Sequence, residues 1–291
     1  MPANIKNQIQ EINYFKNNNL NIKDIIFLND EMYKIVTDDD DFILHIFHEN
    51  SLDKLKKLSI HNQSAIKTGS FDKNHYFEIS KSDNLTNLEE YLKNHNEKEN
   101  YKLGLRFGNL LKEIHTIVPE EKVVWFDFFN TKVNYLFYMH GIHENIGDDD
   151  YILIDYINHN RHLTKSIRQS YIFNNLDFNH IFVDKNENII ISGINFTKIG
   201  DGVYDFVKIN NMALESKDFA LGCFEGYFQH QKAPIKFFRL LALYEAYNIL
   251  DNIVAHRQEK PSIYTKDDLQ NLLKMYDNFN TDVPKWIKEG E

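Results

Sequence analysis

The first eighty residues alternate short apolar runs with polar turns. The runs are rich in β-branched and aromatic residues, which is typical of strands, and asparagine, aspartate and glutamate separate them. Five strands are predicted in this way, at residues 24–28, 32–37, 42–47, 65–68 and 75–80. The spacing of apolar residues predicts a helix over 52–58, after the third strand, and a looser helical segment over 4–18. Sequential antiparallel strands with one inserted helix indicate a small α+β lobe over residues 1–80.

From residue 85 onward, apolar residues recur at helical spacing. The strongest pattern covers 101–117, where one face is apolar throughout. Gly104 and Gly108 lie on one stripe of this helix, so we expect a second helix to pack closely against it. Further helices are predicted at 85–93, 123–139, 149–160, 219–230, 234–255 and 265–277. The second lobe, residues 81–291, is therefore expected to be large and mainly helical.

One stretch of the helical lobe, residues 170–205, has a different pattern. Residues 181–183 are apolar and predict a strand, 184–188 form a polar turn, and 189–191 predict the returning strand. We therefore expect a loop followed by a β-hairpin within the second lobe.

Composition and charge narrow the range of partners. The net charge of −10 and the lack of a basic run argue against binding to nucleic acid, which favours a basic surface. The single cysteine, Cys223, rules out an intrachain disulfide and favours a cytoplasmic protein. No apolar run is long enough to span a membrane, and residues 1–10 lack the apolar core of a signal peptide. We expect no nucleic-acid partner and no membrane association.

Four motifs follow one another in the second lobe. They are Gly104-x3-Gly108-x2-Leu111-x2-Ile114-His115, Phe173-Asn174-Asn175-x4-His180-Ile181-x-Val183-Asp184, Ile191-Ser192-Gly193-Ile194, and Ile199-Gly200-Asp201-Gly202-x-Tyr204-Asp205. Their order and spacing resemble those of the aminoglycoside phosphotransferase and choline kinase family. The resemblance covers most of the chain and implies a protein-kinase-like fold with two lobes, a small β-rich one and a large helical one.

Phosphoryl transfer depends on positioning and on neutralising charge. It requires a carboxylate that takes the proton of the attacking hydroxyl, oxygen ligands for Mg²⁺, and a cation against the nucleotide phosphates. The resemblance assigns each of these roles to a position in this chain, and four of those positions carry an unsuitable residue.

The base position carries Asn175, an amide that takes no proton at pH 7. The metal positions carry His180, a nitrogen ligand poorly matched to Mg²⁺, and Gly193, which has no side chain. The strand position for the phosphate-binding Lys or Arg carries His45, and a histidine is mostly neutral at pH 7. The turn at 28–32 contains no glycine to wrap a phosphate.

Three functions remain open. The first is a catalytically degenerate pseudokinase that binds a small molecule or a protein partner, with no cofactor expected. The second is an active ATP- and Mg²⁺-dependent phosphotransferase acting on a small-molecule alcohol, with Asp177, two residues beyond Asn175, as a relocated base and Asp184 or Asp201 near the metal. The third is an interaction module, which solvent exposure of the aromatic residues of 125–135 would favour.

Several other polar residues are expected to be structural. The resemblance implies that Asp201 caps a helix start, that Asp205 supports a loop, and that His115 bonds the backbone of the catalytic loop. The aspartates at 38–41 are expected to form a solvated turn. The histidine pairs at 140/143 and 159/162 are interpreted as exposed polar positions rather than metal ligands.

Overall fold

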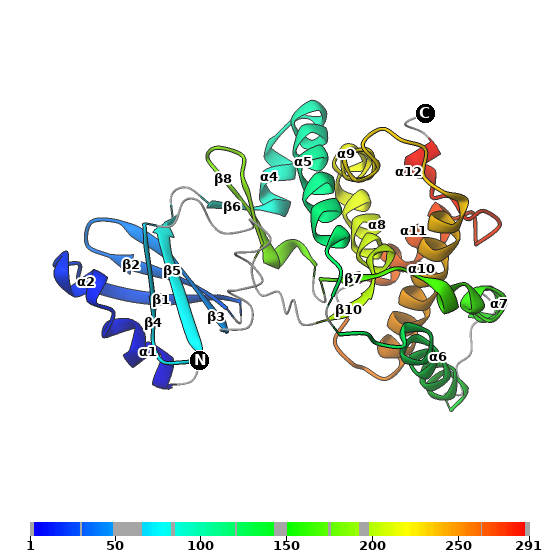
Figure 1. The fold of residues 1–291 in the computed structure, drawn as a ribbon, viewed down its shortest axis with the longest axis horizontal. Coiled ribbons are helices and arrows are strands. Elements are labelled where there is room, and N and C mark those ends of the chain that lie inside the picture. Colours follow the sequence, from blue (N-terminus) through cyan, green and yellow to red (C-terminus); the bar gives the residue numbers. More distant parts are fainter. Residues whose placement is uncertain are drawn as a thin grey trace. The chain divides into compact units, whose positions relative to one another are not determined.

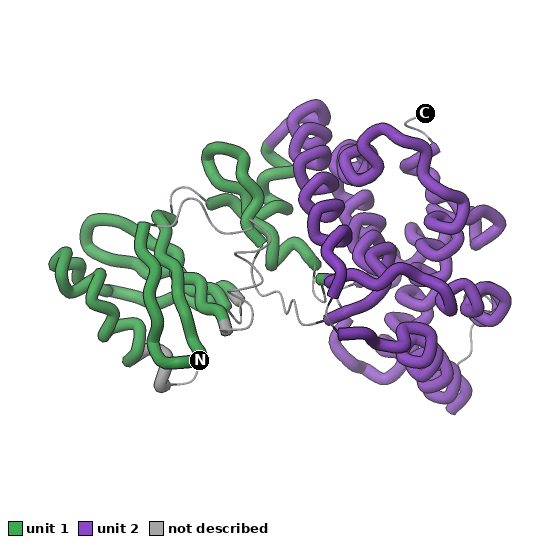
Figure 2. Tube along the Cα trace, viewed as in Figure 1, with its two compact units in different colours: residues 1–94, 173–197 green, residues 95–172, 198–291 purple. Residues whose placement is uncertain are grey.

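The computed structural model describes residues 3–29, 31–48, 66–82, 85–119, 121–142, 150–173, 176–191, 198–262 and 264–288. The chain packs into two units, which Figure 2 colours separately: residues 1–94 with 173–197, and residues 95–172 with 198–291. Each unit is described by itself.

Unit 1 contains the predicted five-stranded antiparallel sheet. Its strands lie side by side in the order β1-β2-β3-β5-β4, so β5 pairs with both β3 and β4 and β4 is an edge strand. The bounds are β1 Ile22–Asn29, β2 Met32–Thr37, β3 Asp41–His48, β4 Lys67–Ser70 and β5 His75–Lys81. The helix predicted over 52–58 lies outside the described residues.

The N-terminal segment forms two short helices where the sequence predicted one. Helix α1 covers Ala3–Gln10 and α2 covers Asn13–Asn17, because Ile12 has an extended backbone (ψ 118°) and begins the second helix. Ile9 and Phe15 are buried in one cluster with Ile35 and Leu44 of the sheet. The two helices therefore cover one face of the sheet (Figure 1).

The predicted hairpin is confirmed and belongs to unit 1. β8 (Ile181–Asp184) pairs with β9 (Ile189–Ile191) and, on its other side, with β6 (Leu85–Asn87). The short helix α4 (Leu88–Asn94) follows β6 and contacts β8. These pairings group residues 85–94 and the hairpin with the sheet, so the division of the chain differs from the predicted lobes 1–80 and 81–291.

Unit 2 contains a close pair of helices, as the glycine stripe predicted. In α5 (Glu97–Thr116), a Cβ added at Gly104 would lie 2.2 Å from the carbonyl oxygen of Phe219, and one at Gly108 would lie 2.0 Å from that of Cys223. Both carbonyls belong to α9 (Lys217–Phe228), whose residues Gly222 and Gly226 approach α5 equally closely. Only glycine allows the two backbones to come so near.

Unit 2 contains six further α-helices in its described part, which Figure 1 shows to one side of α5. They are α6 Trp125–Gly141, α7 Asp150–Asn160, α8 Phe206–Glu215, α10 Ile235–Arg257, α11 Lys266–Met275 and α12 Lys285–Lys288. Two short strands, β7 (Gln169–Tyr171) and β10 (Ile199–Asp201), pair with each other. No helix in the described part of the chain is long and apolar enough to cross a membrane.

Candidate functional site

His45 lies on the face of the five-stranded sheet that α1 and α2 do not cover. It sits opposite Met32 of β2 and Glu78 of β5, and it is 5% exposed. Its Nε2 atom is 3.6 Å from a carboxylate oxygen of Glu31, which is too far for a hydrogen bond. The histidine therefore lies beside two carboxylate side chains, those of Glu31 and Glu78.

The same face is closed by packing against the hairpin. Met32 and Ile43 from the sheet form a buried cluster with Phe182 of β8 and Ile190 of β9. Each of these four side chains is 8% exposed or less, and Leu85 of β6 packs against them. The sheet and the hairpin thus share a small apolar core where their faces meet.

Asp177, the candidate replacement base, is engaged in local structure. Its Oδ1 atom accepts a hydrogen bond from the backbone N–H of Asn179 at 2.9 Å and lies 2.6 Å from Nδ1 of His180. These contacts begin the 3₁₀ turn η3 (Phe178–His180), which leads into β8. Asp177 and His180 are therefore together, whereas Asn175 and Gly193 lie outside the described residues.

Asp184 is also engaged, in the hairpin turn. Its Oδ1 atom accepts from the backbone N–H groups of Asn186 and Asn188, both at 2.8 Å, and its Oδ2 atom accepts from the Asn188 side chain. This carboxylate closes the turn. In the described part of the chain, no three acidic, histidine or cysteine side chains gather as metal ligands do.

The structural role predicted for Asp201 is confirmed in unit 2. Its carboxylate caps the turn η4 (Gly202–Asp205) by accepting from the N–H of Val203 at 3.1 Å. It also accepts from the hydroxyl of Tyr244 at 2.7 Å, and burial raises the pKa of the Asp201 carboxyl group. The tyrosine hydroxyl accepts in turn from the Trp125 indole N–H at 2.9 Å. This buried series of hydrogen bonds links η4 to α10 and α6.

His115 has different partners from those expected. Its Nε2 atom lies 3.1 Å from the Asp205 carboxylate and its Nδ1 atom lies 3.1 Å from the Tyr227 hydroxyl. Both partners are side chains, not the loop backbone. The backbone passes so close that a Cβ at Gly202 would lie 2.6 Å from the His115 ring. Asp205 supports this region, as predicted.

The prediction that the histidine pair at 140 and 143 is exposed was wrong for His140. His140 is 4% exposed, because its Nε2 atom contacts the buried carboxylate of Asp150 at 2.8 Å and Arg257 binds the same oxygen at 2.6 Å. His143 lies outside the described residues. The other pair, at 159 and 162, is exposed and contacts helix carbonyl oxygens, as expected.

The aromatic residues of α6 divide between core and surface. Trp125 and Phe129 are 3% and 1% exposed and pack edge-on against the ring of Tyr244 in α10. Phe128 and Tyr135 are 46% and 62% exposed. The helix thus has one buried aromatic face, and the exposed cluster needed for the interaction-module hypothesis is only partly present.

Comparisons with known proteins agree on the fold. No protein-family model matches the chain, and no curated protein sequence is detectably similar. Among solved structures, choline kinase LicA from Streptococcus pneumoniae matches with a TM-score of 0.57 and 11% identity, over 94% of this chain and 98% of that one.

Two antibiotic phosphotransferases match over a similar span. The ADP-bound aminoglycoside phosphotransferase APH(2'')-Ib gives a TM-score of 0.53 and 17% identity, over 99% of both chains. The AMP-bound spectinomycin phosphotransferase APH(9)-Ia gives 0.56 and 14%, over 97% of this chain and 94% of that one. The chain therefore has the kinase-like fold of the aminoglycoside phosphotransferases and choline kinases, as the motifs predicted.

Proposed function

We propose that the chain is a catalytically degenerate form of these phosphotransferases that acts by binding a small molecule or a protein partner. The observation that carries the proposal is the closed face of the sheet. Several structural neighbours were solved with AMP, ADP or ATP. In protein kinases a lysine on the third strand contacts the phosphates, so a nucleotide would lie against the face that bears His45.

In this chain, that face is already occupied by its own side chains. Met32 and Ile43 form one buried cluster with Phe182 and Ile190. A purine would have to separate the sheet from the hairpin and break this apolar core before it could bind. This close packing stabilises the unit and makes the entry of a nucleotide unfavourable.

The charges at the same face also disfavour a nucleotide. His45 replaces the expected Lys or Arg, and the carboxylates of Glu31 and Glu78 lie beside it. Carboxylates repel the phosphates of ATP, and the Glu31 carboxylate lies beside His45. The sequence at the base and metal positions, Asn175 and Gly193, supports the same interpretation.

The alternative function, an active phosphotransferase that uses Asp177, has less support. The Oδ1 atom of Asp177 is already engaged by the N–H of Asn179 and the ring of His180 in the turn before β8, so this side chain has a structural role there. We infer a cytoplasmic location from the single cysteine, which is fully buried and cannot form an intrachain disulfide.

Phosphate transfer from ATP tests the proposal. The purified chain is incubated with Mg²⁺, radiolabelled ATP and either choline or an aminoglycoside mixture, with a working choline kinase as the positive control. We expect no labelled product above the uncatalysed background. Turnover that Asp177→Ala abolishes would establish the active-kinase alternative instead.

A further inference from the structure

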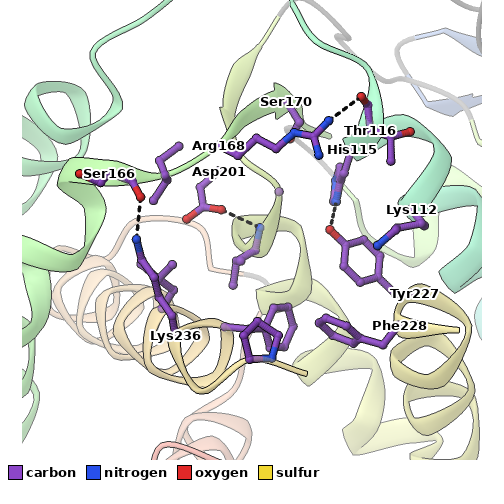
Figure 3. A pocket seen from close by; sticks show the side chains of 16 residues that line it. Lys112, His115, Thr116, Ser166, Arg168, Ser170, Asp201, Tyr227, Phe228 and Lys236 are labelled. Carbon is purple, nitrogen blue, oxygen red and sulfur yellow. Dashed lines mark hydrogen bonds between the residues drawn. The ribbon is translucent and has the colours of Figure 1, made fainter. Parts of the chain in front are cut away.

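A cavity of about 300 Å³ lies within unit 2 (Figure 3). It is bounded by the C-terminal end of α5, the segment before β7, the end of α9 and the first turns of α10. Aromatic and aliphatic side chains form much of its wall, among them Tyr227, Phe237 and Leu240. Every residue that lines it belongs to unit 2, so the cavity is a feature of that unit alone.

Three cationic side chains reach this cavity from three different elements. Lys112 comes from α5, Arg168 from the segment before β7, and Lys236 from α10 (Figure 3). Among the lining residues the single carboxylate is that of Asp201, which already accepts from Val203 and from the Tyr244 hydroxyl. The cavity therefore has a positive balance in a chain whose net charge is −10.

Two of these cations are held in place at the open end of the cavity. Lys236 Nζ donates to the carbonyl oxygen of Ser166 at 2.6 Å, and Arg168 Nη2 donates to that of Thr116 at 2.9 Å. Each bond uses one donor, whereas an ammonium has three and a guanidinium five. Both residues line the cavity and are exposed, so their side chains lie where the cavity meets solvent.

The first turn of α10 adds to the positive field. The helix is 23 residues long, and its N-cap residue, Pro234, makes no side-chain cap to the first N–H groups. Uncapped N–H groups at the start of a long helix attract anions. Pro234 and Lys236 both line the cavity, so this helix start faces the same space.

A buried hydroxyl supplies an independent sign of a ligand. Ser170, the middle residue of β7, lines the cavity and is 2% exposed. Its Oγ atom has no hydrogen-bond partner in the described part of the chain. A buried hydroxyl without a partner is unfavourable, and a polar ligand atom in the cavity would satisfy it.

We propose that this cavity binds a small organic carboxylate with an apolar or aromatic body. The carboxylate lies at the mouth between Lys236 and Arg168, where charge-assisted hydrogen bonds form. The apolar body lies along Tyr227 and Phe237 and extends toward Ser170. The volume suits a ligand at the small end of the usual range. The site shares no residue with the sheet face of unit 1. The proposal holds whether or not the chain binds a nucleotide.

Calorimetric titration of the full chain tests this site with matched probes. Phenylacetate and 2-naphthylacetate supply the carboxylate and a one- or two-ring body, and the corresponding amides have the same shape without the charge. We expect at least one acid to bind at concentrations up to about 10 mM, and roughly tenfold more tightly than its amide. Absence of binding by both acids, or equal affinity for acid and amide, would overturn the proposal.

Substitutions identify the residues responsible. Arg168→Gln and Lys236→Gln are each expected to weaken binding of the acid roughly tenfold and to leave the amide unaffected. Lys165→Gln is the matched control, since it removes the same charge nearby while its Nζ lies 5.1 Å from the Phe126 ring centre, outside the cavity. Equal losses in all three variants would show a general charge effect and contradict the site.

Ser170→Ala separates a ligand contact from a structural role. Because the hydroxyl has no partner in the described chain, its removal should not lower the melting temperature, but it should weaken the acid about threefold if the ligand reaches it. A lower melting temperature with unchanged affinity would contradict the proposed orientation of the ligand.

Discussion

His45 lies directly opposite Glu78 across strands β3 and β5, and both residues are almost fully buried. A kinase of this fold needs a permanent cation on the third strand to meet the nucleotide phosphates. This chain places a histidine there, beside a buried carboxylate and 3.6 Å from a second one on Glu31. We therefore propose that the chain retains the kinase-like fold, while the sheet face on which kinases of this fold bind the nucleotide phosphates has become part of its core.

The packing of that face predicts the cost of opening it. Phe182 is 8% exposed and packs against Met32 and Ile43. Phe182→Ala should lower the free energy of unfolding by about 3 to 5 kcal/mol, because it removes a buried aromatic ring and leaves a cavity. Phe27→Ala is the control, since Phe27 is 53% exposed and its loss should cost about 1 kcal/mol or less. Equal small losses in urea unfolding would mean that the face is not a packed core.

The contact between α5 and α9 predicts a strong effect at a single glycine. A Cβ at Gly108 would lie 2.0 Å from the carbonyl oxygen of Cys223. Gly108→Ala should therefore push the two helices apart and lower the free energy of unfolding by about 3 kcal/mol or more. A methyl group added at Gly141, at the end of α6, would meet no described atom of a neighbouring segment within 4 Å. Gly141→Ala should be neutral or stabilise by up to about 1 kcal/mol. Thermal unfolding of both variants tests the difference, and similar melting temperatures would refute it.

Glu245 predicts a pH dependence of stability. It is fully buried in α10, and burial raises the pKa of its carboxyl group to about 7, although Asn210 and Asn248 donate to its two oxygens. Below the ordinary pKa of 4.5 the group is protonated in both the folded and the unfolded state and contributes nothing. As pH rises from there to 7, only the unfolded state ionises, so the folded state loses stability. The loss is complete above pH 7 and amounts to roughly 3 kcal/mol.

The variant Glu245→Gln should lack this loss. Relative to the original chain, its unfolding free energy should improve between pH 5 and pH 8 by roughly 2.5 kcal/mol. The same substitution at the exposed Glu121 is the control and should produce no such trend. Urea unfolding at the two pH values provides the measurement, and parallel behaviour of both variants would contradict the assignment.

Local patterns predicted much of the fold. The short apolar runs between polar turns indicated the strands of the sheet and the hairpin, and the stripe of Gly104 and Gly108 predicted the close approach of a helix. Helix α5 begins at Glu97, earlier than the predicted 101, because a capping box forms at its start. The side chain of Asn96 accepts from the backbone N–H of Glu99, and the Glu99 carboxylate accepts from the backbone N–H of Asn96. That capping box was visible in the sequence and would have corrected the boundary.

Features that join distant segments were not predictable from local patterns. The pairing of β6 with β8 places the hairpin in unit 1, and no local signal indicates which strand β6 meets. His140 is buried because Asp150 and Arg257 come from other helices. The cations of the cavity, Lys112 of α5 and Lys236 of α10 among them, likewise come together only through the tertiary fold of unit 2.

Calorimetric titration with ATP, with and without Mg²⁺, tests the central claim most directly. It should be performed on the original chain and on His45→Lys, which restores the cation but leaves the Met32–Phe182 packing and both carboxylates in place. The account predicts no Mg²⁺-dependent binding heat in either protein at nucleotide concentrations up to about 1 mM. Saturable, Mg²⁺-dependent binding of ATP to either protein would contradict it.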